Sequence, residues 1–254
     1  MEFAKKCGHL NCLYLVEKMN YTTTQYRGSV SESSTFLNEV FAWMGLGLAL
    51  TAVVAYFVAN TPSFLAMLVT ETGGLSMLGY VAMFAPIGFV LAMSFGYQRL
   101  SYTALLGLFV AYAGIMGVSM SFIFLAYTAE SIYSIFGISA LMFGAMALIG
   151  YTTKTDLTKM GNLLLMALVG IVIASVVNMF LHSGPMGFVI SIVSVLVFCG
   201  LTAYDVQKIK NLGEEAGMDV ISKSKLGIMG ALTLYLDFIN LFLALLRLFG
   251  NRRD

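Results

Sequence analysis

The chain has 254 residues, of which 59% are hydrophobic and 11% are charged, and its formal net charge is +1. Soluble domains carry about 25% charged residues, so this composition excludes an ordinary soluble protein and indicates a polytopic membrane protein. The near-neutral charge provides no basic field for nucleic acid, so we expect no nucleic-acid partner.

Residues 1–35 are polar and are predicted to form a cytoplasmic N-terminal tail. They contain no sustained apolar run and no small-residue cleavage site, so they do not resemble a secretory signal. Met19 is a candidate for the true start, with residues 1–18 as an upstream extension. Cys7, His9 and Cys12 lie close together, but a zinc site needs a second ligand pair, so we expect no metal there.

Residues 36–250 are predicted to form a single transmembrane domain of seven helices, because a helical span needs about 20 apolar residues. The predicted spans are residues 40–59, 77–95, 103–126, 132–149, 163–181, 186–208 and 226–249. Residues 251–254 form a short basic C-terminal tail. The predicted fold is therefore an all-α polytopic membrane protein.

Lysine and arginine occur in the N-terminal tail and in alternate connections, whereas the connections 60–76, 127–131 and 182–185 contain neither. The positive-inside rule therefore places the N-terminus in the cytoplasm. Three arginines disagree with this pattern, because seven full crossings would leave them outside: Arg247, Arg252 and Arg253. We predict a full crossing for the last segment, with a re-entrant or central element as the alternative.

Small residues spaced four apart predict close contacts between helix backbones. Such lines are Ala113, Gly117 and Ser121 in the third span, Ala140 and Gly144 in the fourth, and Gly170 and Ala174 in the fifth.

Two acids, Asp205 and Asp237, lie inside apolar runs. An ionised carboxylate in hydrocarbon costs about 2.5–3.5 kcal/mol or more, so each must be partnered, hydrated or protonated. On the helical period each acid lies on a polar or small face. Asp205 shares its face with Ser191, Ser194, Leu201 and Lys208, and Asp237 shares its face with Gly230, Thr233, Asn240, Ala244 and Arg247. Both acids are therefore predicted to point into the bundle.

The last two spans are consecutive and antiparallel, so we expect Asp205 and Asp237 to face each other. Two carboxylates in a low dielectric cannot both ionise cheaply, and such a pair shares a proton and responds to pH. When both are ionised, the pair suits transient binding of calcium. The two acids reach the same depth only if the sixth helix continues past Lys208 or the seventh begins earlier. The alternative is two unrelated acids, with Asp205 paired to Lys208 and Asp237 alone.

Arg99 lies at the predicted cytoplasmic junction of the second and third spans. The simplest interpretation is a positive-inside anchor. The alternative is a latch, in which the guanidinium pairs with Asp205 and competes with its protonation.

Several motifs together resemble the Bax inhibitor-type (transmembrane Bax inhibitor motif) family. They are LYLDFINLF at 234–242 followed by LLRLFG at 245–250, AYDVQKIK at 203–210, and GVSMS at 117–121. The resemblance implies a seven-helix fold with the C-terminal helix central. Its bacterial members are similar to a pH-sensitive calcium leak channel whose sensor is a pair of membrane aspartates, which correspond to Asp205 and Asp237, with Arg99 as the closed-state partner.

The predicted function is accordingly a pH-sensitive calcium leak channel, a monomer of the bacterial inner membrane with calcium as permeant ion and no cofactor. One alternative is a regulatory or interaction protein without transport, acting on protein partners that the sequence does not identify. A second is an intramembrane aspartyl protease, but the Gly-x-Gly-Asp and Pro-Ala-Leu motifs are missing, so we expect no enzyme. A retinal protein is excluded because residues 226–250 contain no lysine.

Overall fold

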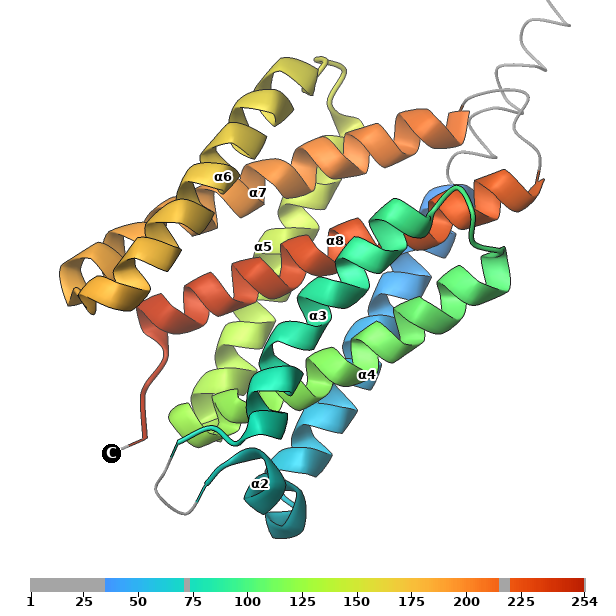
Figure 1. Ribbon diagram of the computed structural model, residues 1–254. Coiled ribbons are helices and arrows are strands. Elements are labelled where there is room, and N and C mark those ends of the chain that lie inside the picture. Colours follow the sequence, from blue (N-terminus) through green and yellow to red (C-terminus); the bar gives the residue numbers. More distant parts are fainter. Residues whose placement is uncertain (1–34, 71–73, 215–219, 254) are drawn as a thin grey trace, which may run out of the picture.

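The computed structural model describes residues 35–70, 74–214 and 220–253, most of which are helical (Figure 1). Within these ranges, seven helices are long and apolar enough to cross a membrane. They are Thr35–Ala59, α3 (Met77–Gly96), α4 (Tyr102–Ala126), α5 (Ala129–Thr152), α6 (Thr158–Leu181), α7 (Gly184–Glu214) and α8 (Val220–Phe249). The short α2 (Pro62–Leu68) follows the first span. The predicted all-α fold with seven spans is confirmed. Met19 and the cysteine-histidine cluster at 7–12 lie outside the described residues.

Local polar residues determine where several helices begin and end. The Ser76 hydroxyl accepts a hydrogen bond from the Gly79 N–H at 3.1 Å, and the Ser101 hydroxyl accepts one from the Ala104 N–H at 3.2 Å. These bonds satisfy backbone donors that have no partner inside the helix. α6 ends at His182, whose left-handed backbone (φ 51°) stops the helix. The apolar sequence is thereby divided into separate spans.

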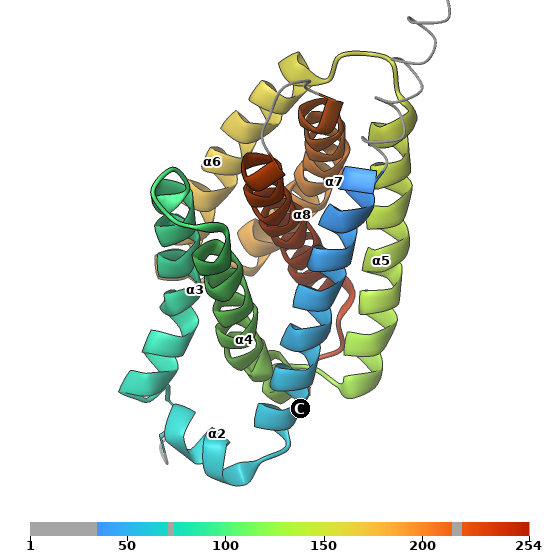
Figure 2. The same ribbon diagram turned by 90° about the vertical axis from the view of Figure 1, so that its right-hand side faces the viewer.

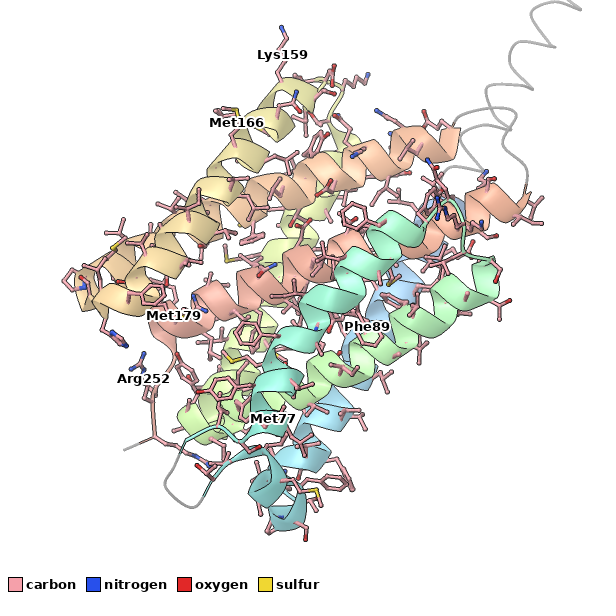
Figure 3. All side chains as sticks on the ribbon, in the orientation of Figure 1. Met77, Phe89, Lys159, Met166, Met179 and Arg252 are labelled. Carbon is pink, nitrogen blue, oxygen red and sulfur yellow. The ribbon has the colours of Figure 1, made fainter. Side chains whose placement is uncertain are left out.

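The spans differ strongly in how much of their surface other helices cover. In α8, 72% of the apolar stretch is buried, whereas in α6 the share is 6%. The α6 side chains Met166 and Met179 are exposed, as expected for a surface that faces lipid (Figure 3). α8 packs against α4, α5 and α7 (Figure 2). A hydrogen bond between Tyr235 and Thr51 joins it to the first span. That all six other helices surround α8 stays a prediction.

The last two spans are longer than predicted. α7 continues to Glu214, beyond the predicted end at 208, and α8 begins at Val220, before the predicted start at 226. The predicted bounds lie where lysines interrupt the apolar residues. A helix can nevertheless continue into water if one of its faces remains buried. The extension of α7 has such a buried face, because its Gly213 lies against the ring of Phe36.

The predicted close contacts through small residues are confirmed at one position and wrong at two. Gly117 lies against the backbone oxygen of Thr51. Gly144 and Gly170, in contrast, face open space, because they lie on the exposed sides of α5 and α6. The close approaches in these helices occur at Gly150, which touches the backbone of Ala203, and at Gly161, against the Tyr204 ring.

The C-terminal segment follows α8 to the end of the bundle that holds the α4–α5 connection. The Thr128 N–H donates to the Asn251 carbonyl at 3.1 Å, and the Asn251 N–H donates to the Ser131 hydroxyl at 3.0 Å. Figure 3 shows Lys159 and Arg252 near opposite ends of the bundle. α8 is uninterrupted over its whole length, which a full crossing requires. That the last segment crosses the membrane stays a prediction.

Candidate functional site

The structure brings together the two acids that the sequence singled out. The carboxyl groups of Asp205 on α7 and Asp237 on α8 lie within hydrogen-bonding reach of each other. The extension of both helices beyond their predicted ends removes the difference in depth that stood against this pairing. The interpretation as two unrelated acids is therefore wrong, whereas the pH-sensing role of the pair stays a prediction.

The environment of Asp237 is nearly closed to solvent. Its side chain is 5% exposed, and its Oδ2 atom has no hydrogen-bond partner among the described residues. Asp205 is half-buried. A buried carboxylate oxygen without a partner is costly. The arrangement therefore requires a proton, a cation or water at Asp237, and two carboxyl groups this close can share a single proton.

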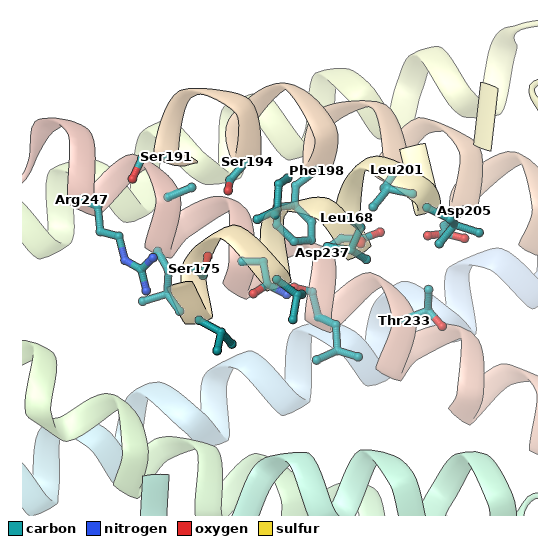
Figure 4. A pocket seen from close by; sticks show the side chains of 18 residues that line it. Leu168, Ser175, Ser191, Ser194, Phe198, Leu201, Asp205, Thr233, Asp237 and Arg247 are labelled. Carbon is teal, nitrogen blue, oxygen red and sulfur yellow. The ribbon is translucent and has the colours of Figure 1, made fainter. Parts of the chain in front are cut away.

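Both aspartates line a cavity of about 570 Å³ between α6, α7 and α8 (Figure 4). The lining contains most of the two faces predicted from the helical period. From α7 these are Ser191, Ser194, Leu201 and Asp205, and from α8 they are Thr233, Asp237, Asn240, Ala244 and Arg247. On the third side of the cavity, α6 contributes apolar side chains and Ser175. Both acids therefore point into the bundle, as predicted.

Arg99 is not brought to the aspartates in this conformation. It lies in the turn between α3 and α4, where its side chain is exposed and its backbone N–H donates to the Gly96 carbonyl at 2.9 Å. No ion pair joins it to Asp205, although both residues belong to the described part of the chain. The latch between Arg99 and Asp205 thus stays a prediction about another state of the protein.

The fit of a calcium ion depends on oxygens other than carboxylates. Over residues 35–70, 74–214 and 220–253, no three side chains of the types His, Cys, Asp and Glu gather in one place. Calcium takes six to eight oxygen ligands in general. Asp205 and Asp237 would supply the charge, and hydroxyl, amide and water oxygens would have to supply the rest. This donor set suits transient binding and not a permanent site.

Gln207 lies two residues after Asp205 on α7 and anchors this part of the helix. It was not singled out from the sequence, although it belongs to the AYDVQKIK motif. Its Oε1 accepts from the Leu157 N–H at 2.8 Å, and its Nε2 donates to the Thr155 carbonyl at 2.8 Å. Gln207 therefore ties the α5–α6 connection to the part of α7 that carries Asp205. In the same connection, hydrogen bonds from Thr158 hold the pKa of Asp156 below its usual value.

A second network on the other side of α8 was also missed. The Thr51 hydroxyl donates to the Ala113 carbonyl at 2.9 Å and shares a hydrogen bond of 2.7 Å with the Tyr235 hydroxyl. Because Thr51 has a single proton and uses it on Ala113, Tyr235 is the donor. This network joins the first span, α4 and α8. The sequence feature that could have indicated this network is Thr51, a polar residue in the middle of an apolar span.

Comparison with known proteins agrees with the motifs. The family model described as "Inhibitor of apoptosis-promoting Bax1" matches residues 33–254. The chain is 48% identical to the inner membrane protein YbhL of Escherichia coli over 220 residues, which cover 86% of this chain and 92% of the relative. It is 43% identical to the protein RP147 of Rickettsia prowazekii, covering 92% and 97% of the two chains. A protein of Borreliella burgdorferi is 42% identical, with 91% and 98% covered. The chain therefore belongs to the Bax inhibitor family and is a multi-pass integral membrane protein.

Proposed function

We propose that the protein is a pH-sensitive calcium leak channel, gated by the protonation of Asp205 and Asp237. The observation that carries the proposal is the facing pair of carboxyl groups in a cavity, with one buried oxygen of Asp237 that has no partner in the described part of the chain. A pair of this kind changes its net charge with pH, because its two carboxyl groups share protons.

The change in charge provides a simple gating scheme. With a proton between them, Asp205 and Asp237 hold α7 and α8 together through a hydrogen bond. Loss of the proton leaves two negative charges that repel each other and attract a divalent cation. Arg99 would compete for Asp205 when the turn between α3 and α4 moves towards α7, which closes the path. The protein acts as a monomer in this scheme, with calcium ions and protons as its partners and no cofactor.

The relatives and the charge distribution support a location for the protein. The Escherichia coli relative is named an inner membrane protein. We place this chain in a bacterial inner membrane, with its N-terminus in the cytoplasm, because lysine and arginine are concentrated in the N-terminal tail and in alternate connections.

The test is calcium flux through the purified protein in proteoliposomes, measured with an enclosed calcium dye across neutral pH. We expect the wild-type flux to depend on pH, and Asp205→Asn and Asp237→Asn to lose this dependence. Glu130→Gln removes an exposed carboxylate at the start of α5 and serves as the control, with an unchanged pH profile. An aspartate variant that keeps the wild-type profile contradicts the gating scheme. Wild-type vesicles that leak no more than empty ones contradict the channel and favour an interaction protein without transport.

A further inference from the structure

Besides Ser175 on α6, four neutral polar side chains lie in the same cavity as the aspartate pair: Ser191 and Ser194 on α7, and Thr233 and Asn240 on α8. In Figure 4, Ser191 and Ser194 lie between Arg247 and the aspartates. The serines are buried, with 3% and 7% of their surface exposed. Burial of polar groups in a membrane protein is costly. The gathering of these four side chains in one cavity therefore needs a physical explanation.

Their hydrogen bonds show what these side chains present to the cavity. Ser191 donates its proton to the Gly187 carbonyl at 2.9 Å, and Ser194 donates to the Ile190 carbonyl at 2.7 Å. A hydroxyl has one proton, so each oxygen keeps only lone pairs for other partners. Both serines can therefore accept from or coordinate a ligand in the cavity, but they cannot donate to it.

The two polar side chains of α8 also offer acceptor oxygens, although Asn240 keeps one N–H as a donor. Thr233 donates to the Met229 carbonyl at 3.0 Å, and the Asn240 amide donates to the Leu236 carbonyl at 2.8 Å. Thr233 is left with lone pairs, and Asn240 keeps its carbonyl oxygen as an acceptor. Together with the carboxylates, these groups give the cavity an excess of acceptors, which suits a cation and not an anion.

A second cavity extends this region towards the α6–α7 connection. It measures about 630 Å³ and shares Ser175, Ser191 and Arg247 with the first cavity. It also reaches His182 and Arg252, at the end of the bundle that holds the C-terminus. The two cavities therefore form a sequence of polar positions that runs from Asp205 and Asp237 to that end.

We propose that Ser191, Ser194 and Asn240, which we call the oxygen ladder, are the ligands that pass a hard cation between the aspartate pair and the far end of the bundle. Asp237 lines the same cavity, and its buried Oδ2, which has no hydrogen-bond partner among the described residues, also indicates a cationic or protonic occupant. The positive charge of Arg247 opposes a cation at the end of the ladder, so each ion stays only briefly. This inference rests on the proposed function and names the residues that determine its selectivity.

The first experiment measures calcium flux in proteoliposomes for Ser191→Ala combined with Ser194→Ala. We expect the flux to fall about tenfold, which corresponds to a barrier raised by about 1.4 kcal/mol. The matched control is Ser139→Ala, because Ser139 is buried and donates to the Ile135 carbonyl at 2.7 Å but does not line the cavity. Ladder variants that conduct like Ser139→Ala overturn the inference while the channel itself stands.

The second experiment does not depend on calcium flux. Cys7, Cys12 and Cys199 are replaced by serine in the full chain, and Ser194→Cys is treated in membranes with thiol reagents of opposite charge. We expect faster modification by the cationic reagent, and slower modification when calcium is added. Ser139→Cys is the control, with slow modification by either reagent. Equal reactivity at the two positions, or faster modification by the anionic reagent, overturns the ladder. If the wild type does not conduct, the proposed function fails, and this result still decides whether the cavity admits cations.

Discussion

The carboxyl group of Asp237 faces that of Asp205 within hydrogen-bonding reach, at a position where 5% of the Asp237 side chain is exposed. The contact exists because α7 and α8 both extend further than their apolar runs. Two carboxylates at this distance repel each other strongly unless one of them carries a proton. The protonated carboxyl group of this pair should therefore be detectable by infrared spectroscopy.

We expect the wild-type protein to show an infrared band of a protonated carboxyl group at neutral pH. We expect Asp237→Asn to remove the band and Asp205→Asn to shift its frequency, because the buried Asp237 carboxyl group then stays protonated but loses its partner. Either change leaves a single acid next to an amide, which no longer has a carboxylate with which to share a proton. Glu130→Gln should leave the band unchanged, since Glu130 is exposed. If the band persists unchanged in both aspartate variants, the two residues do not share a proton.

Gly150→Ala should lower the stability of the protein by about 1–3 kcal/mol, as overpacked positions do. A Cβ atom at Gly150 would overlap the carbonyl oxygen of Ala203, and a backbone atom cannot move aside as a flexible side chain can. The measurement is thermal unfolding in detergent, followed by circular dichroism.

Gly144→Ala is the control for this change, because Gly144 lies in the same helix and faces open space. Alanine in a helix interior is favoured over glycine by about 0.5–1 kcal/mol, so this variant should be as stable as the wild type or slightly more stable. Equal losses for the two variants would show that α5 and α7 do not approach closely at Gly150.

Tyr235→Phe and Tyr112→Phe should have opposite effects, although each removes one hydroxyl from the same pair of rings, whose centroids are 5.3 Å apart. Tyr235→Phe removes the hydrogen bond to Thr51 and should cost about 1 kcal/mol. The hydroxyl of Tyr112 is buried and has no hydrogen-bond partner within the described residues, so its removal should be neutral or stabilising. Unfolding by heat in detergent compares the two; a larger loss for Tyr112→Phe would contradict the network as described.

Ser131→Ala should loosen the C-terminal segment where it contacts the α4–α5 connection. The Ser131 hydroxyl accepts from the Asn251 N–H, and a lost hydrogen bond of this kind costs about 1 kcal/mol. We expect faster removal of the C-terminal residues by carboxypeptidase, measured by mass spectrometry. Ser134→Ala, an exposed position in the next turn, is the control and should be digested like the wild type. Equal rates for all three proteins would mean that the segment is not held there.

The sequence alone determined the seven spans and the two polar faces that carry Asp205 and Asp237. Both depend on local properties: a run of apolar residues is long enough to cross a bilayer, and the helical period puts Ser191, Ser194 and Asp205 on one side whatever they contact. These predictions needed no knowledge of which helices are neighbours.

The tertiary structure decided which of these faces meet and how closely. Gly144 and Gly150 lie in the same helix and are the same residue type, but only the second touches another backbone, because contact depends on the placement of α7. The bond between Thr51 and Tyr235 joins residues far apart in the chain for the same reason. Asp205 and Asp237 lie at the same depth because α7 and α8 continue beyond their apolar runs. These helix ends remain helical because one face stays buried. Packing between helices, which no local pattern records, therefore turned two separate acids into one site.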